Sequence, residues 1–335
     1  MRVGSRASGA ARGPATTLRN TGAMADCTTM PAFVPDAGAP ARVALGDVPE
    51  PEPQAAEALV AVEAYSVNRG ETFLLESPRD GWRPGQDVAG RVERAAADGS
   101  GPPAGTRVVA HVPGGGWSAR VAAPTDALAA LPDGVEATTA STLGVAGLTG
   151  LRLVRAAGAL AGRRLLVTGA SGGVGHFVAE LAAAQGALVT AVSASAQRGE
   201  RLRALGAAAV VTDVAEAEGP FDVIMESVGG PSLETAVTLL APHATLLWFG
   251  GASRRPAALD FFTAVSRAPY ASIVPWTYWR TGASDADDLA TLVRLVAGGR
   301  LHPEIGVVED WRRTPDVLTA IVERRVRGNA VLSVS

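Results

Sequence analysis

The stretch RRLLVTGASGGVGHFVAELAAAQGALVTA, residues 163–191, decides the fold. It opens with an apolar run, 165–167, that is short enough for a buried parallel strand. The run leads into a turn of small residues, 169–175, after which apolar side chains recur at helical spacing up to Gly186. A second apolar run follows over 188–192. The pattern predicts one β-α-β unit.

The small residues of this turn suit a pyrophosphate. Gly172 lets the backbone approach an anion, and Gly175 lets helix and strand pack closely. The start of the helix adds free N–H groups and the positive end of its dipole. A glycine turn can also simply cap a strand, but the position between two strand-like runs about 20 residues apart favours dinucleotide binding. The motif reads A-x-G-x-x-G, and its candidate cofactor-binding residues are Ser171, Gly172, Gly173, Val174 and Gly175.

The end of the second strand indicates which dinucleotide binds. NAD sites usually place Asp or Glu here for the ribose 2′-hydroxyl, and residues 192–198, VSASAQR, contain neither. Ser193 and Ser195 offer hydroxyls, and Arg198 offers a guanidinium whose fixed fork fits phosphate oxygens. A polar turn followed by a solvated arginine face is the alternative. We therefore favour NADPH as the cofactor.

Length and composition limit the classes of protein and partner. At 335 residues the chain is long enough for two domains, and its 47% apolar and 19% charged content is that of a globular protein. No apolar run approaches the roughly 18 residues that span a bilayer. The net charge of -3 gives no basic footprint for nucleic acid. We expect neither a membrane nor a nucleic acid as a partner.

Three residue types limit the chemistry. The single cysteine, Cys27, excludes an internal disulfide framework and fits a reducing compartment, so we expect a cytoplasmic protein. No lysine occurs, which excludes a lysine Schiff base. No spacing typical of a zinc site links the four histidines, which are His111, His176, His243 and His302.

Changes of pattern along the chain predict its organisation. Residues 1–30 are small and polar without periodicity, and we expect a disordered extension. Residues 31–146 show short alternating runs broken by Gly and Pro, which is typical of a mostly antiparallel β domain. Over 147–279, helical and strand-like segments alternate, which indicates a doubly wound parallel sheet. Residues 280–335 have no place in that sheet and should return to complete the first domain.

Several motifs occur in the order found in one superfamily. Besides the glycine turn they are VNRGETF at 67–73, PGQDVAG at 84–90, GLT at 147–149 and FDVIMESVG at 221–229. Over roughly 41–334 the chain resembles the zinc-independent quinone oxidoreductase, or zeta-crystallin-like, branch of the medium-chain dehydrogenase/reductase superfamily. The resemblance implies an α/β fold, with an NADP-binding Rossmann domain beside a GroES-like β domain that the C-terminal segment completes. It also implies a homodimer.

The resemblance assigns roles to individual residues. Asn68 and Thr149 match positions at the nicotinamide end of the cofactor cleft and are the candidate catalytic residues, although each could instead bond only to backbone. Arg198 matches a basic residue on the 2′-phosphate. Ser227 and Gly250 follow two later strands, at the sheet edge over which the cofactor passes.

The chain departs from the family in two informative places. Zinc-dependent members carry a Cys and a Gly-His-Glu, where this chain has Gly85-Gln86-Asp87, so no metal is expected. Phe73 stands in place of a tyrosine, so a proton donor must lie elsewhere or be water. A second tyrosine, which often holds the 2′-phosphate, falls near Asp213 and weakens the case for NADPH.

Chemistry without metal, flavin or lysine requires a substrate that is already electrophilic. A quinone or an α,β-unsaturated carbonyl (an enone or enoyl compound) accepts hydride directly from a nicotinamide. The sequence therefore predicts an NADPH-dependent quinone or enoyl reductase. A redox-neutral, cyclase-type step and a non-catalytic nucleotide-binding protein are the alternatives.

Candidate substrate contacts are Tyr65, Phe73 and Trp276. Tyr65 precedes Asn68 by three residues, so on a strand it points to the opposite face, which favours a structural role. Trp276 opens the aromatic run 276–279, WTYW, which suits a stacking wall for a flat substrate but equally a dimer edge or a hinge. His111 ends a strand-like run and could reach the cleft, but we expect a surface histidine there.

Overall fold

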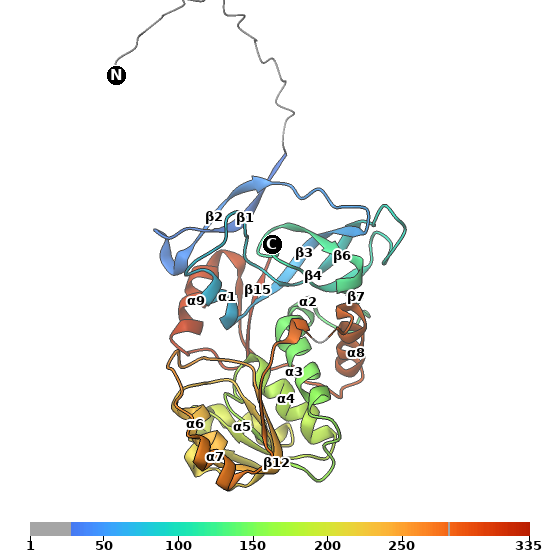
Figure 1. Ribbon diagram of the computed structural model, residues 1–335. Helices are drawn as coiled ribbons and strands as arrows, with labels where there is room; N and C mark the ends of the chain where they lie inside the picture. The colour runs from blue at the N-terminus through green and yellow to red at the C-terminus, as the bar shows by residue number, and fades with distance from the viewer. Residues whose placement is uncertain (1–27, 281) are drawn as a thin grey trace, which may run out of the picture.

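The computed structural model describes residues 28–280 and 282–335, and two large sheets dominate it (Figure 1). The extension predicted over 1–30 lies outside the described residues as far as 27, and Cys27 lies outside with it. The end of that prediction is wrong, because Thr29 and Met30 already form the start of β1 and Met30 is buried.

The first sheet joins strands from both ends of the chain. Among the described residues its strands follow the order β14-β15-β3-β4-β5-β7, and β6 pairs with β3. Pairing is antiparallel except between β14 and β15. A separate ribbon of β1 and β2 lies beside this sheet (Figure 1). The strands are β1 (Thr29–Pro35), β2 (Val43–Pro49), β3 (Glu57–Val67), β4 (Asp87–Arg94), β5 (Arg107–His111), β6 (Arg120–Pro124), β7 (Leu128–Ala130), β14 (Ile305–Asp310) and β15 (Asn329–Ser333).

The second sheet is parallel and occupies the other half of the molecule (Figure 1). Within the described ranges its strands follow the order β10-β9-β8-β11-β12-β13. The chain order reverses between β8 and β11, and ligands of open α/β sheets bind at such a point. The strands are β8 (Arg164–Val167), β9 (Leu188–Val192), β10 (Ala209–Val211), β11 (Phe221–Glu226), β12 (Leu240–Trp248) and β13 (Ser272–Pro275).

The β-α-β unit predicted over 163–191 forms as β8, α4 (Gly173–Ala184) and β9. The apolar face of α4 is fully buried at Phe177, Val178 and Ala182. Gly186 ends the turn that follows with φ of 85°, a conformation that glycine adopts without strain. Hydrophobic spacing and glycine punctuation therefore predict this unit correctly.

The C-terminal segment returns to the first sheet, as the fold prediction requires. β15 pairs antiparallel with β3, so that Leu332 lies opposite Tyr65. β14 then adds to the outer side of β15. Helices α8 (Asp285–Ala297) and α9 (Thr314–Val322) precede these two pairings. The chain thus passes from one half of the molecule to the other and back.

The remaining helices cover the sheets and line the space between them. None of the helices in the described part of the chain is long and apolar enough to cross a membrane. These helices are α1 (Arg69–Leu74), α2 (Ala137–Ala140), α3 (Val145–Ala156), α5 (Ala196–Ala204), α6 (Pro231–Thr238), α7 (Phe261–Arg267) and the short 3₁₀ turn η5 (Tyr278–Arg280).

Candidate functional site

A cavity of about 1000 Å³ lies between the two halves of the molecule. It extends from the carboxyl ends of β8, β11 and β12 to the end of β3 and the start of α1. This is the position expected for a ligand at the switch point of the parallel sheet. The sequence-predicted residues that line it are Asn68, Phe73, Thr149, Ser171, Gly172, Gly173, Val174, Gly175, Ser193, Arg198, Ser227, Gly250 and Trp276.

Two predicted site residues do not line this cavity. Tyr65 is fully buried in the core of the first sheet, where its ring stacks on Trp117 with centroids 6.0 Å apart. Its hydroxyl lies 2.7 Å from the Thr314 hydroxyl, and burial raises the pKa of Tyr65. Tyr65 is therefore a structural residue, and its prediction as a substrate contact is wrong. Ser195 instead caps α5, where its Oγ accepts from the Arg198 N–H at 3.3 Å.

The glycine turn before α4 contains glycines of two different kinds. A methyl group at Gly175 would lie 2.5 Å from the Ala170 Cα and 2.5 Å from the Gly169 carbonyl oxygen, so this glycine is required for packing. A methyl group at Gly172 would meet only the Gly169 oxygen, at 3.2 Å. Since Gly172 also lines the cavity, its missing side chain leaves room for a ligand at the start of α4. This cradle fits a dinucleotide diphosphate.

The Arg198 guanidinium lines the cavity and also makes contacts that the sequence did not predict. Its two terminal nitrogens donate to the backbone carbonyls of Arg324 and Val326, in the segment between α9 and β15. Burial lowers the pKa of Arg198, and the nearby Arg327 and Arg324 lower it further. Arg198 therefore fastens α5 to the C-terminal return while lining the cavity. Backbone carbonyls carry no sequence signal, so this contact could not be foreseen.

Asn68 is held by buried carboxylates. Its Nδ2 donates to Asp87 Oδ2 at 2.6 Å, and Asp87 also accepts from Ser66 Oγ at 2.8 Å and from the Val145 N–H at 2.7 Å. The Asn68 N–H donates to Glu71 Oε2 at 2.9 Å. The Asn68 side chain is thus oriented by a side-chain carboxylate rather than by backbone alone, which distinguishes it from an ordinary strand-end residue.

Burial changes the acidity of both carboxyl groups. Neither Glu71 nor Asp87 has any exposed surface. Burial, together with the charge of Asp87, raises the pKa of Glu71 to about 8. Burial also raises the pKa of Asp87, although His111 and the hydrogen bonds from Asn68, Val145 and Ser66 oppose the shift.

Thr149 lies on the α3 face that borders the cavity. It is buried except for 5% of its surface, and the cavity is in contact with the part that remains. The position on α3 follows from helical spacing, because the neighbouring Leu148, Leu151 and Leu153 are buried in the core. Thr149 thus brings a hydroxyl to the same end of the cavity wall as Val145, whose N–H is held by Asp87.

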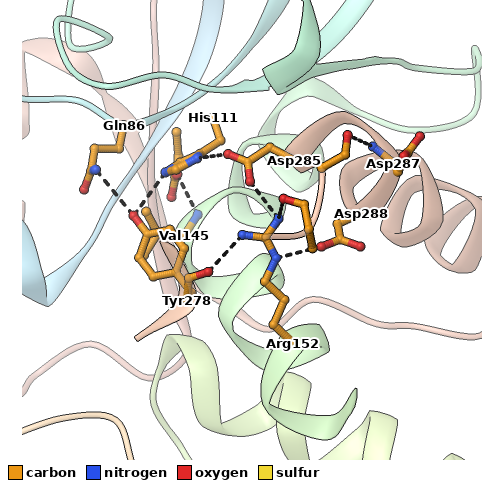
Figure 2. Close-up of polar contacts among 11 residues, drawn as sticks. Gln86, His111, Val145, Arg152, Tyr278, Asp285, Asp287 and Asp288 are labelled. Carbon is orange, nitrogen blue, oxygen red and sulfur yellow. Dashed lines mark hydrogen bonds and ion pairs between the residues drawn. The ribbon is translucent and has the colours of Figure 1, made fainter. Parts of the chain in front are cut away.

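His111 belongs to a polar network that the sequence did not reveal (Figure 2). Its Nδ1 lies 2.7 Å from Asp285 Oδ2, and its Nε2 lies 3.1 Å from the Tyr278 hydroxyl. Arg152 donates to Asp285 Oδ1 at 2.7 Å and to Asp288 Oδ2 at 2.7 Å. The expectation of a surface histidine is wrong, because Asp285 is 174 residues away in sequence and no local pattern joins the two.

All four residues of the aromatic run 276–279 line the cavity. Trp276 follows β13 and packs partly against the main core, whereas Trp279 is 66% exposed. The Tyr278 and Trp279 rings meet edge to face with centroids 5.0 Å apart. Of the readings left open by the sequence, a wall of the cavity is the one that this placement favours.

Gln86 stands where the family's zinc-dependent members have histidine. Its Nε2 lies 3.5 Å from the Tyr278 hydroxyl (Figure 2). Within residues 28–280 and 282–335, no group of three or more His, Cys, Asp or Glu side chains is placed to hold a metal ion.

Comparisons with known proteins find similarity to a dehydrogenase family and to quinone oxidoreductases. Residues 173–280 match the family described as zinc-binding dehydrogenase. A quinone oxidoreductase of Mus musculus is 30% identical over 214 residues, which cover 58% of this chain and 65% of that protein. A chloroplast envelope quinone oxidoreductase homolog of Arabidopsis thaliana is 32% identical over 206 residues, which cover 57% and 61%. The match thus spans somewhat less than two thirds of the length of these relatives.

Solved structures match almost the whole chain. The quinone oxidoreductase from Coxiella burnetii is 22% identical with a TM-score of 0.79, covering 92% of this chain and 100% of that one. The Escherichia coli quinone oxidoreductase complexed with NADPH is 20% identical with a TM-score of 0.80, covering 91% and 100%. These neighbours confirm the predicted pairing of a Rossmann domain with a GroES-like domain. The motif order, the architecture and these relatives agree, and the chain is similar to the quinone oxidoreductases of the medium-chain dehydrogenase/reductase superfamily.

Proposed function

We propose that the protein is an NADPH-dependent oxidoreductase that reduces a quinone or an α,β-unsaturated carbonyl compound without a metal. The observation that carries this proposal is that one cavity joins the glycine cradle to Asn68, Thr149 and the aromatic run 276–279. A nucleotide extended along the parallel sheet would reach this polar end with its nicotinamide. When bound, the nicotinamide supplies the hydride.

The residues that would hold the dinucleotide lie in order along the cavity. The turn 171–175 and the start of α4 suit the diphosphate, since Gly172 leaves its side free and α4 is twelve residues long. Ser193 and Ser227 line the cavity on either side of this turn. Gly250 lets the ends of β11 and β12 approach, because a methyl group there would lie 2.6 Å from the Ser227 carbonyl oxygen.

Charge along the cavity favours a phosphate at the adenosine end. Arg198 and Arg324 line it, against the carboxylate of Asp213. Burial lowers the pKa of Arg198, and the charges of Arg327 and Arg324 lower it further, so these cations repel one another. A 2′-phosphate would offset that repulsion. This balance supports NADPH over NADH.

The other end of the cavity is built to orient a flat substrate. Asn68 is fixed by Asp87, so its side chain need not be ordered again when a ligand binds. Phe73, Trp276 and Trp279 present apolar surface around it. Such a wall excludes water and strengthens polar contacts to a developing oxygen anion.

We also propose a homodimer. β13 is the last strand in the order of the parallel sheet, and Ile273 and Val274 on it are exposed. Phe261 and Phe262 on the neighbouring α7 are 70% and 79% exposed. An uncovered strand edge beside apolar side chains is typical of a surface that pairs. Light scattering on the purified protein measures the mass directly, and a monomer at micromolar concentration would refute the dimer.

Nucleotide binding and turnover test the main proposal separately. Fluorescence titration with NADPH and NADH gives both affinities, and we expect NADPH to bind more tightly. Absorbance of the reduced nicotinamide then follows its oxidation with menadione, phenanthrenequinone and a series of 2-alkenals. Binding with turnover of at least one acceptor is the expected result. No affinity for either nucleotide would overturn the proposal, and binding without turnover would favour a non-catalytic protein.

A further inference from the structure

Tyr278 brings a phenol to a site that lacks the family's own. The chain has three tyrosines. Tyr65 is enclosed in the first sheet, Tyr270 is 82% exposed, and Tyr278 lines the cavity. Phe73, at the family's tyrosine position, lines the same cavity without offering a proton. A different tyrosine therefore supplies a hydroxyl at this site.

The Tyr278 hydroxyl lies at the end of the cavity that holds Asn68. Gln86 points to this hydroxyl (Figure 2). The next residue, Asp87, binds the Asn68 amide at 2.6 Å. Tyr278 and Asn68 are thus connected through two adjacent residues at the start of β4. Asn68 and Tyr278 both line the cavity, so a substrate that reaches Asn68 shares this cavity with Tyr278.

The proton of His111 is placed by its contact with Asp285. A carboxylate only accepts hydrogen bonds, so Nδ1, 2.7 Å from Asp285 Oδ2, carries a proton. Arg152 keeps Asp285 ionised: partial burial acts to raise the pKa of Asp285, but hydrogen bonds from His111 and Arg152 lower it overall. The remaining ring nitrogen, Nε2, faces the Tyr278 oxygen at 3.1 Å.

Two protonation states of His111 follow from this arrangement. When the ring is neutral, Nε2 has no proton and accepts from the Tyr278 hydroxyl. When the ring is protonated, Nε2–H donates to the Tyr278 oxygen, and the tyrosine no longer donates its own proton to His111. Arg152 also donates to Asp288 Oδ2 and to the Tyr278 carbonyl oxygen, at 2.7 and 3.1 Å, so hydrogen bonds link Tyr278, His111, Asp285 and Arg152 into one network.

We propose that the Tyr278 hydroxyl protonates the oxygen anion of the reduced substrate, and that His111, positioned by Asp285, returns a proton to Tyr278. This rests on the proposed function. Hydride adds to the substrate carbon, and its electron pair moves the carbonyl π electrons onto oxygen. The O–H bond of Tyr278 breaks as the O–H bond of the enol or hydroquinone forms. The tyrosine oxygen then takes the Nε2 proton of the protonated His111 ring, which becomes neutral and is protonated again from water.

The acidity of Tyr278 suits a group that must hold its proton until an anion appears. Burial raises the pKa of Tyr278, and the charges of Asp87 and Asp285 raise it further. The phenol is therefore fully protonated at neutral pH, and only a strong base such as an enolate beside it draws the proton away.

Tyr278→Phe removes the hydroxyl and keeps the ring that meets Trp279. With a 2-alkenal we expect kcat to fall about 100-fold, because a positioned acid contributes roughly 10² to 10⁴. KM and the NADPH affinity should change little. The solvent isotope effect on kcat should change together with kcat. His111→Gln, which affects proton return only, should give a smaller loss in kcat. Tyr270→Phe is the matched control, and an equal loss there would overturn the proposal.

A second readout needs neither cofactor nor turnover. p-Nitrophenol is a flat phenol whose ionised form absorbs visible light, so its absorbance reports whether the cavity stabilises an oxygen anion. We expect the bound dye to be more ionised in the wild-type protein than in Tyr278→Phe. Equal ionisation, with equal alkenal turnover, would overturn the proposal. If the wild-type protein failed to oxidise NADPH with every acceptor tested, the proposed function would fail. The dye would still decide whether Tyr278 stabilises an oxygen anion.

Discussion

Adding one methyl group at Gly172, and one at Gly175, should separate the two tasks of the glycine turn. At Gly172 the backbone has φ of -89° and ψ of 178°, which alanine adopts without strain. Its methyl group would approach only the Gly169 oxygen, at 3.2 Å. The loss of unfolded-state freedom offsets that contact by about 0.4 to 1 kcal/mol, so the free energy of unfolding should change by less than about 1 kcal/mol.

The same methyl group at position 172 should weaken NADPH binding. At Gly172 the methyl group would face the cavity, where a diphosphate would accept hydrogen bonds from backbone N–H groups. A hydrogen bond to a charged group contributes about 1.5 to 3 kcal/mol, and about 1.4 kcal/mol is a factor of ten in Kd. Losing one such bond should therefore weaken NADPH roughly 10- to 100-fold.

Gly175→Ala should behave in the opposite way. Its methyl group would overlap the Ala170 Cα and the Gly169 oxygen, both 2.5 Å away, and these backbone atoms cannot move aside cheaply. Overpacking of this kind costs about 1 to 3 kcal/mol or more. We expect a fall in Tm of several degrees before any specific effect on binding.

NADPH fluorescence titration and thermal melting measure the two effects on the same samples. Gly134→Ala is the control, because a methyl group there meets nothing within 4 Å and the residue does not line the cavity. If Gly172→Ala bound NADPH as tightly as the control, the backbone would not be in contact with the nucleotide. The assignment of the cradle would then be refuted.

Three further substitutions test the surroundings of the site. The pKa of Glu71 is raised to about 8 from an unfolded value of about 4.3, so its stabilising contribution is complete below about pH 4 and is lost as pH rises to about 8. Glu71→Gln should therefore flatten the pH dependence of the urea-unfolding free energy over that range. An unchanged slope, or an equal change in Glu63→Gln, whose side chain is 41% exposed, would contradict this prediction. Phe73→Tyr made in the Tyr278→Phe background should restore alkenal turnover several-fold by supplying a second phenol, and no gain in kcat would show that position 73 does not reach the substrate oxygen. Arg198→Gln should weaken NADPH binding roughly tenfold and NADH binding much less. Equal weakening in titrations with both nucleotides would mean that Arg198 serves only to hold the backbone of 324–326.

Local patterns were sufficient for the dinucleotide half of the fold. The strand, the glycine turn and α4 follow from spacing within 163–191, and each is determined by neighbours in sequence. Asn68 and Thr149 could be placed at one cavity because the motifs around them are family motifs. The alternation of side chains along a strand correctly predicted that Tyr65 points away from the cavity. Its prediction as a substrate contact was therefore wrong.

Contacts between distant residues account for what sequence reasoning missed. His111, Asp285 and Tyr278 meet only because β5, the start of α8 and the turn after β13 come together. None of the three lies in a motif with a fixed spacing to the others. Ser195 is a different case, since a serine before a helical run is a recognisable cap and its hydroxyl is used by the Arg198 N–H.

The late segment 324–329 contacts the nucleotide cradle directly. The Gly328 N–H donates to the Ser171 carbonyl oxygen at 2.9 Å, and a methyl group on Gly173 would lie 2.8 Å from the Asn329 side-chain oxygen. During synthesis, the ribosome makes the turn 171–175 well before this segment emerges. The binding cradle of the nascent protein therefore cannot be finished until the segment 324–329 has emerged, and a stop codon ahead of position 324 would leave a dinucleotide fold without one of its walls.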